Sequence, residues 1–323
     1  KYINSSILTK MLEENFGIVW IMIKKDLVIK FLSISLLFFG NFVSAERFQD
    51  DPITKLNSPI TELGFIRENI ISDDGVMINY YIKGTDKKAL VFVHGYSCSS
   101  EYWWPQLEYF SKDHTVIAVD IAGHGGSGLN RQEYSMDAFG NDVTSVIEHL
   151  DLEEVVLIGH SMGGPVIVKA ANNLGVKTRL IVGVDTFHDL STEGIGGFAR
   201  TAVNTMFKLF YESMTEDSID DFFIDKTDED LARWIRNDAL KSPKHISQGT
   251  LNALLTMNYP ESLRELSIPI IALNARTFRE TKLDSNMNTY KNLQIEFMED
   301  VGHFIMLERP VEFNNWLETK ISK

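Results

Sequence analysis

The sequence Val155-Val-Leu-Ile-Gly-His-Ser-Met-Gly-Gly164 decides the fold, because it joins an apolar segment to a helical pattern through a serine between two glycines. The apolar segment predicts a buried strand, and residues 162–174 predict a helix. A serine that links a strand to a helix needs a sharp turn, which lifts its hydroxyl outward. We predict that Gly159 and Gly163 are required, because a Cβ at either position would collide with the opposite side of the turn. Ser161 is therefore the candidate nucleophile.

Apolar strand patterns alternate with helical patterns on both sides of this stretch. The predicted strands are Met77–Ile82, Ala89–Val93, Thr115–Asp120, Val155–Gly159, Leu180–Asp185, Pro269–Asn274 and Leu293–Met298. The predicted helices are Glu101–Phe110, Ser135–Leu150, Met162–Leu174, Thr201–Tyr211, Asp228–Leu240, Lys282–Asn292 and Val311–Lys320. This alternation predicts an α/β protein with a doubly wound, mostly parallel sheet, because parallel neighbours need crossover helices.

The composition is that of a globular protein. The chain has 323 residues, of which 44% are apolar, and this excludes a disordered or collagen-like chain. Its formal charge of −14 argues against a basic nucleic-acid-binding surface. The single cysteine, Cys98, cannot form an internal disulfide, and the chain has no Cys pair for a zinc or redox site.

Residues 22–45 have the pattern of a signal peptide, with a lysine-containing start, an apolar run at 27–39 and small residues before the cleavage site. The apolar run is shorter than the roughly 20 residues of a membrane-spanning helix, although an uncleaved anchor is the alternative. We interpret residues 1–21 as an upstream extension and 46–323 as the folded domain. We expect an exported protein, periplasmic or secreted, with no stable membrane span after cleavage.

A long insertion separates two of the predicted strands. More than eighty residues lie between Asp185 and Pro269, and their pattern is mostly helical. A segment of this length is too large for a simple loop, so we predict a helical cap at about residues 187–262. Ligands of open α/β sheets bind at the carboxyl ends of the strands, so a cap that emerges there would roof the site.

Four motifs, in this order, resemble those of the α/β-hydrolase superfamily over about residues 62–322. They are His94-Gly95-Tyr96, Asp120-Ile-Ala-Gly-His-Gly-Gly-Ser127, the turn around Ser161, and Gly302-His303. The resemblance implies the α/β-hydrolase fold, with the helical cap inserted after the strand that ends at Asp185. These motifs are specific for the fold and much less specific for the substrate.

The resemblance also implies roles for individual residues. His303 would be the general base that takes the Ser161 proton, and the backbone N–H groups of Tyr96 and Met162 would form the oxyanion hole. The implied enzyme is a serine hydrolase, carboxylesterase-like, that cleaves esters with an apolar acyl or alcohol part through an acyl-enzyme. Its implied partner is a small-molecule ester, without nucleic acid, metal or organic cofactor.

The acid of the catalytic triad departs from the common pattern. The family usually takes it from the loop after the strand Pro269–Asn274, where this chain has Ala275-Arg276-Thr277. Some relatives place the acid at the end of the preceding strand, and there this chain offers Asp185. We therefore predict Asp185 as the acid, with Asp284 as the alternative acid. Without a catalytic role, Asp185 would only anchor the cap.

Three further residues are candidates for substrate binding. Phe187 and His188 lie at the predicted entrance to the cap, and Trp103 belongs to an aromatic cluster next to the oxyanion loop. Each of them also has a simple structural interpretation. Aromatic side chains of this kind are more often core residues, and for His188 packing and pocket lining are equally compatible with the sequence.

The sequence leaves several activities open. Serine at position 161 argues against epoxide hydrolase and haloalkane dehalogenase chemistry, because those members of the fold use a carboxylate nucleophile. Thioesters, lactones, amides, C–C bonds and perhydrolysis remain compatible with it. The rival hypothesis is a ligand-binding member with little or no hydrolytic activity, and the missing acid after Asn274 is its best support.

Overall fold

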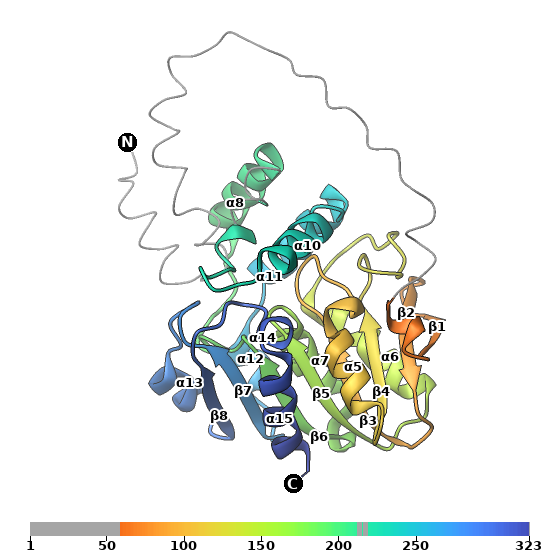
Figure 1. Cartoon of the computed structure of the whole chain (residues 1–323). Helices are drawn as coiled ribbons and strands as arrows, with labels where there is room; N and C mark the ends of the chain where they lie inside the picture. Colours follow the sequence, from red (N-terminus) through yellow and green to blue (C-terminus); the bar gives the residue numbers. More distant parts are fainter. Residues whose placement is uncertain (1–58, 212–214, 216–218, 323) are drawn as a thin grey trace, which may run out of the picture.

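An eight-stranded sheet forms the centre of the protein, in the order β1-β2-β4-β3-β5-β6-β7-β8 (Figure 1). The computed structural model describes residues 59–211, 215 and 219–322, so the predicted signal peptide at 22–45 and the extension at 1–21 lie outside the described residues. The strands are β1 (Ile66–Ile71), β2 (Met77–Lys83), β3 (Lys88–Val93), β4 (Thr115–Asp120), β5 (Glu154–His160), β6 (Thr178–Val184), β7 (Ile270–Ala275) and β8 (Leu293–Met298). Pairing is antiparallel at β1–β2 and β2–β4 and parallel from β4 to β8. The predicted doubly wound, mostly parallel sheet is confirmed.

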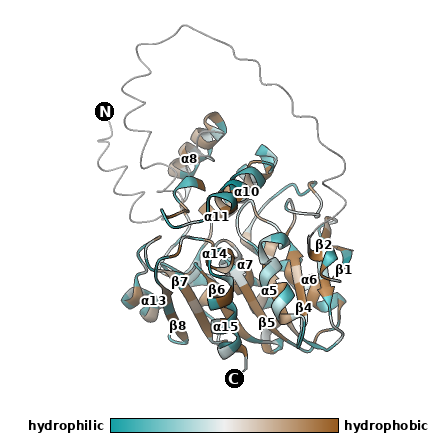
Figure 2. Cartoon of the chain, viewed as in Figure 1, coloured by the Kyte–Doolittle hydropathy of each residue, from teal (hydrophilic) through white to brown (hydrophobic). Residues whose placement is uncertain are grey.

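Helices cover both faces of this sheet. Outside the insertion the helical segments are α4 (Pro59–Glu62), η1 (Ser100–Trp103), α5 (Trp104–Phe110), α6 (Met136–His149), α7 (Gly163–Leu174), η2 (Gly175–Lys177), α13 (Leu283–Thr289), α14 (Ile305–Glu308) and α15 (Pro310–Ile321). The short helix α12 (Tyr259–Leu263) lies at the end of the insertion, just before β7. The apolar sides of α6 and α7 pack on one face, and those of α5 and α15 pack on the other. Figure 2 shows the apolar strands in the middle and hydrophilic surfaces on the outer sides of the helices.

Successive residues of the central strands supply two separate cores. In β3, Val91 and Val93 belong to the core beneath α6 and α7, whereas Leu90 and Phe92 belong to the core beneath α5 and α15. This follows from the period-2 alternation of a strand. Because both faces are buried, the central strands read as continuous apolar runs in the sequence.

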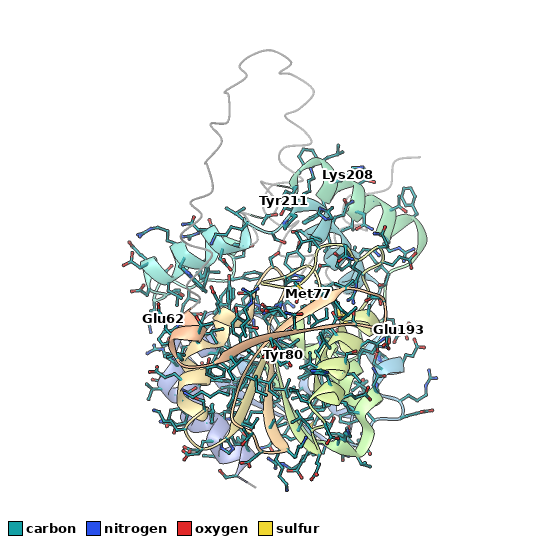
Figure 3. All side chains as sticks on the ribbon, turned by 90° about the vertical axis from the view of Figure 1, so that its right-hand side faces the viewer. Glu62, Met77, Tyr80, Glu193, Lys208 and Tyr211 are labelled. Carbon is teal, nitrogen blue, oxygen red and sulfur yellow. The ribbon has the colours of Figure 1, made fainter. Side chains whose placement is uncertain are left out.

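The insertion between β6 and β7 forms a helical cap at the carboxyl ends of the parallel strands (Figure 1). Its helices are α8 (Gly197–Leu209), α10 (Glu229–Ala239) and α11 (Lys244–Leu255). In the side view, Lys208 and Tyr211 lie at the top of the molecule, above Tyr80 of β2 (Figure 3). The cap therefore emerges at the end of β6, as predicted, and lies over the edge where the elbow of Ser161 is found.

The strand β1 and the helix α11 are absent from the sequence prediction, as are the short segments α4, η2, α12 and α14. β1 is an edge strand whose side chains are mostly exposed, so its sequence lacks the apolar alternation of a half-buried strand. α11 follows Pro243 without a side-chain cap, and Gly249 lies in its interior. Both features weaken a helical signal. Within the described ranges, no helix is both long and apolar enough to span a membrane.

Candidate active site

Ser161 occupies the turn between β5 and α7 in a left-handed conformation, with φ of +51°. This backbone region is costly for a residue with a side chain and is often found at functional sites. The turn is held by the Ser161 N–H, which donates to Val184 O on β6 at 3.0 Å. A Cβ added at Gly159 would lie 2.5 Å from Gly163 O, and one added at Gly163 would lie 2.5 Å from Val93 O. The predicted collision across the turn is confirmed for Gly159. Gly163 is also required, but there the added Cβ would collide with the end of β3 and not with the opposite side of the turn.

The loop after β3 crosses directly over this turn. A Cβ added at Gly95 would lie 3.2 Å from Ser161 Cβ, so the two backbones are in close approach. The next amide, that of Tyr96, and the amide of Met162 donate no hydrogen bond to another described residue. Met162 also precedes the first residue of α7, where the helix dipole favours negative charge. Two N–H groups without a partner among the described residues therefore belong to the residue after Gly95 and to the residue after Ser161.

His303 lies on the loop after β8, and aromatic rings from other parts of the chain enclose its imidazole. Its ring centroid lies 4.6 Å from those of Phe222 and His160 and 4.5 Å from that of Phe278. The carbonyl of His303 accepts a 3.0 Å hydrogen bond from Nε2 of His160. Burial holds the pKa of His303 well below its usual range, so the imidazole is neutral near pH 7.

Asp185 follows β6 directly and contacts His303. Its Oδ2 accepts a hydrogen bond from His303 Nδ1 at 2.5 Å, and its Oδ1 accepts one from the Ala275 N–H at 2.8 Å. Burial raises the pKa of Asp185 to about 6, while His188, the Ala275 N–H and Arg279 act in the opposite direction. Because Nδ1 of His303 is occupied by Asp185, the other ring nitrogen, Nε2, is left for proton transfer.

The alternative acid lies elsewhere. Asp284 is exposed on α13, and no hydrogen bond or ion pair joins it to His303 within the described ranges. Near the end of β7, Asn274 uses Oδ1 to accept the Thr186 N–H at 3.1 Å. An amide cannot supply the charge of a carboxylate at this place. The geometry thus brings Asp185, and not Asp284, to the imidazole.

Ser161 and His303 line the same small pocket beneath the cap. The cavity has a volume of about 30 Å³. It is lined by Tyr96, Ser97, Cys98, Tyr102, His160, Ser161, Thr215, Ile219, Phe222, Ile235, Ala239, His303 and Phe304. Its roof comes from the cap and is mostly apolar.

The three predicted substrate-binding side chains do not line this pocket. Trp103 is fully buried in the core, with its ring centroid 5.1 Å from that of Phe92. Phe187 is buried beneath the cap and packs on Tyr259, at a centroid distance of 5.9 Å. His188 contacts Asp185 and not the pocket, with its Nε2 3.5 Å from Asp185 Oδ1, whereas His303 contacts Oδ2. Trp103 and Phe187 are therefore core residues, which is the structural interpretation that the sequence also allowed.

Sequence reasoning missed the apolar roof of the pocket. Ile235 and Ala239 are four residues apart and share one face of α10, which was the available signal. Ile219 lies in the segment before α10. The position of these side chains over Ser161 depends on how the cap packs, which a local pattern does not encode.

Cys98 lies next to the nucleophile turn but does not have the surroundings of a reactive thiol. Its Sγ donates to Tyr96 O at 3.3 Å, and burial raises the pKa of the thiol. A protonated thiol is a poor nucleophile. Among the residues that the structure describes, no group of three or more His, Cys, Asp or Glu side chains is arranged to hold a metal ion.

Comparison with known proteins places these features in a family. The sequence model of the alpha/beta hydrolase family matches residues 90–316. A soluble epoxide hydrolase of Corynebacterium sp. (strain C12) is 23% identical over 272 residues, which cover 74% of this chain and 93% of that protein. A non-heme haloperoxidase of Rhodococcus erythropolis is 27% identical over 254 residues, which cover 72% and 92%. An esterase structure from Exiguobacterium antarcticum has a TM-score of 0.71 at 20% identity and covers 80% of this chain and 100% of that chain.

Proposed function

Because this chain belongs to the alpha/beta hydrolase family, we propose that it is a serine hydrolase that cleaves carboxylic esters through an acyl-enzyme. One observation carries the proposal. Ser161, in a left-handed turn, lines the same pocket as His303, and Nδ1 of His303 is 2.5 Å from the Asp185 carboxylate. A nucleophile and a base that share one pocket, with a carboxylate on the far ring nitrogen of the base, support activation of the serine hydroxyl.

The proposed reaction has two stages. Ser161 Oγ attacks the carbonyl carbon while Nε2 of His303 accepts its proton, and the Asp185 carboxylate stabilises the imidazolium that forms. The N–H groups of Tyr96 and Met162 hold the negative oxygen of the tetrahedral intermediate. The intermediate expels the alcohol, which takes the proton back from His303. A water molecule, deprotonated by His303, then attacks the acyl carbon. The bond to Ser161 Oγ breaks, Oγ takes the proton back from His303, and the carboxylic acid is released.

Serine at position 161 favours ester cleavage over opening of an epoxide. The epoxide hydrolase relative shares the fold, but the carboxylate nucleophile associated with that chemistry has no counterpart at this position of the chain. A serine alkoxide attacks carbonyl carbon, and the two free amides next to it suit the oxyanion that results. The serine and the two amides together therefore support acyl transfer.

The size of the pocket supports a short acyl group. A cavity volume of roughly 10–15 Å³ holds one water molecule. The volume of about 30 Å³ therefore has room for about two non-hydrogen atoms. The two carbon atoms of an acetyl group fit this space without displacement of the cap, if its oxygen is held by the N–H groups of Tyr96 and Met162. The apolar side chains of Ile219, Ile235 and Ala239 disfavour a charged acyl group.

Two measurements test the proposal. A fluorophosphonate probe is expected to label the wild-type protein on Ser161, and Ser161→Ala is expected to abolish labelling, while Ser191→Ala on the surface leaves it unchanged. The initial rates on p-nitrophenyl acetate, butyrate and octanoate are expected to fall in that order. An unlabelled protein without hydrolysis of any of these esters would support the rival, a ligand-binding member of the fold.

A further inference from the structure

A second imidazole contacts the acid at the carboxylate oxygen that His303 does not use. His188 is buried, and its Nε2 lies 3.5 Å from Asp185 Oδ1. The other ring nitrogen, Nδ1, lies 2.9 Å from Thr281 Oγ1. Asp185 is thus flanked by two histidines, one on each carboxylate oxygen.

The hydrogen bonds around His188 define its tautomer. The Thr186 N–H can only donate, so Oδ1 of Asn274 is the acceptor, at 3.1 Å, and the orientation of this amide is fixed. Nδ2 of Asn274 therefore donates, to Thr281 Oγ1 at 3.1 Å and toward His188 Nδ1 at 3.4 Å. The Thr281 hydroxyl proton is left to donate to His188 Nδ1. With Nδ1 as an acceptor, the ring proton resides on Nε2 and faces Asp185.

The backbone around His188 keeps the imidazole in this place. Its carbonyl accepts the Lys282 N–H at 2.8 Å and Nδ2 of Asn286 at 3.1 Å. Within the described residues, the Nε2 atom is buried and has no hydrogen-bond partner of ordinary geometry. A buried donor without a better partner keeps its orientation toward the charge that it faces, here the carboxylate of Asp185.

Resting on the proposed function, we propose that His188 is a positioning residue that acts through Asp185. Its neutral imidazole directs Nε2–H at Asp185 Oδ1 and holds the carboxylate so that Oδ2 receives the Nδ1–H of His303. Asn274, which stands on the strand that usually leads to the acid, then has a different task, because it helps to clamp this second imidazole.

A neutral imidazole suits this role better than a charged one. A cation would cancel the field of Asp185 that stabilises the His303 imidazolium, whereas a neutral N–H fixes the carboxylate and leaves its charge in place. Burial lowers the pKa of His188 to about 4, with Asp185 raising it and Arg279 and His303 lowering it. His188 is therefore uncharged at the pH at which a neutral His303 can act as a base.

Two substitutions separate positioning from packing. In His188→Phe the N–H is lost and the ring is kept. We expect kcat on p-nitrophenyl acetate to fall by roughly 3–10-fold, the effect of a weak polar contact, with KM within about twofold, because the 3.5 Å approach of Nε2 to Asp185 Oδ1 is longer than an ordinary hydrogen bond. The acidic limb of the kcat/KM profile is expected to move to higher pH, because the deprotonated Asp185–His303 pair loses a donor. His188→Gln, which keeps an N–H, is expected to restore most of kcat and of the pH profile.

The control is His245→Gln on the exposed side of α11, which is expected to change neither quantity. If the wild type is labelled and active but His188→Phe keeps its kcat and acidic limb, the inference is wrong and the proposed function stands. Equal losses in the Phe and Gln variants, with an unmoved limb, would also refute positioning. If His188→Phe does not fold, Thr281→Val is tested in its place. An unchanged acidic limb of the kcat/KM profile in Thr281→Val would then refute the positioning role of His188. A wild type that is neither labelled nor active contradicts the proposed function, and the inference with it.

Discussion

The backbone N–H of His303 donates a 2.9 Å hydrogen bond to the carbonyl of Phe222. Phe222 belongs to the insertion between β6 and β7, so the cap is bonded directly to the loop that carries the imidazole. The two rings also pack, with centroids 4.6 Å apart. The cap is thus both the roof of the pocket and a support of the proposed base.

Phe222→Ala is expected to lower kcat on p-nitrophenyl acetate by roughly tenfold, because the imidazole loses an aromatic neighbour that restricts its orientation. Phe223→Ala is the matched control, since the Phe223 ring packs on Phe304 and does not line the pocket. Steady-state kinetics of both variants provide the measurement. Equal losses in the two variants would mean that general disruption of the cap, and not the contact with His303, is responsible.

Asp185→Asn is expected to reduce kcat by about 10⁴-fold, because an amide neither stabilises the imidazolium nor maintains the tautomer of His303. Asp284→Asn is expected to leave kcat within about twofold, since Asp284 is exposed on α13. The rate of p-nitrophenyl acetate hydrolysis distinguishes them. The reverse result would transfer the role of the acid to Asp284.

Gly163→Ala is expected to destabilise the protein by about 1–3 kcal/mol, because the new Cβ would lie 2.5 Å from the backbone oxygen of Val93, which cannot easily move. Gly196→Ala is a suitable control. It has φ of −105° and no atom within 4 Å of the added Cβ, so its stability should match or slightly exceed that of the wild type. Urea unfolding followed by circular dichroism measures both. Equal midpoints for the two variants would contradict close packing at the elbow.

Ile235→Ala is expected to increase the rate on p-nitrophenyl octanoate relative to acetate by at least about fivefold, because it removes a buried side chain from the roof of the pocket. Leu240→Ala, just after α10 at an exposed position, should leave this ratio unchanged. The ratio of kcat/KM values is the readout. An unchanged ratio in Ile235→Ala would show that this side chain does not limit the acyl length.

The thermal unfolding midpoint is expected to fall as the pH is lowered from 7 to 5. Burial lowers the pKa of His94 to about 4, of His124 to about 3 and of His188 to about 4, so below pH 6.5 the unfolded chain takes up protons that the folded protein does not. Burial raises the pKa of Asp142 and Asp185 to about 6. These two carboxyl groups take up protons in the folded protein first, which stabilises it toward pH 5, but they are fewer than the three histidines and their pKa shifts are smaller. Calorimetry between pH 5 and pH 8 measures the net change of the unfolding midpoint with pH. A midpoint that rises toward pH 5 would contradict it.

The sequence allowed prediction of those parts of the site that depend on local chain geometry. The turn at Ser161 is specified by its two glycines and the strand and helix around it, all within ten residues. Asp185 was predictable because a residue at the carboxyl end of β6 lies next to the elbow in a parallel sheet, and Ser161 N–H indeed bonds to Val184 O. Strand order and direction support Asp185, but its choice over Asp284 also needed the resemblance to relatives that carry the acid at the end of this strand.

Side-chain direction in the surrounding shell was not predictable in the same way. Trp103 lies next to the oxyanion loop in sequence, but η1 turns its ring into the core against Phe92. Ile235 and Ala239 are far from Ser161 in sequence, and it is the packing of α10 over the sheet that brings them to the pocket. Long-range packing of the cap, and not local pattern, selects the residues that would contact substrate.

The cap also reaches the other side of the site, because the Tyr96 hydroxyl donates to Ser247 O on α11 at 3.2 Å. If this insertion were replaced by that of another hydrolase, the hydroxyl of Tyr96 and the backbone N–H of His303 would both lose the carbonyl groups that accept their hydrogen bonds. A recombinant would need to bring equivalent carbonyl groups with it. We expect new specificities in this lineage to arise through point substitutions inside the insertion, and wholesale exchange to yield inactive hybrids.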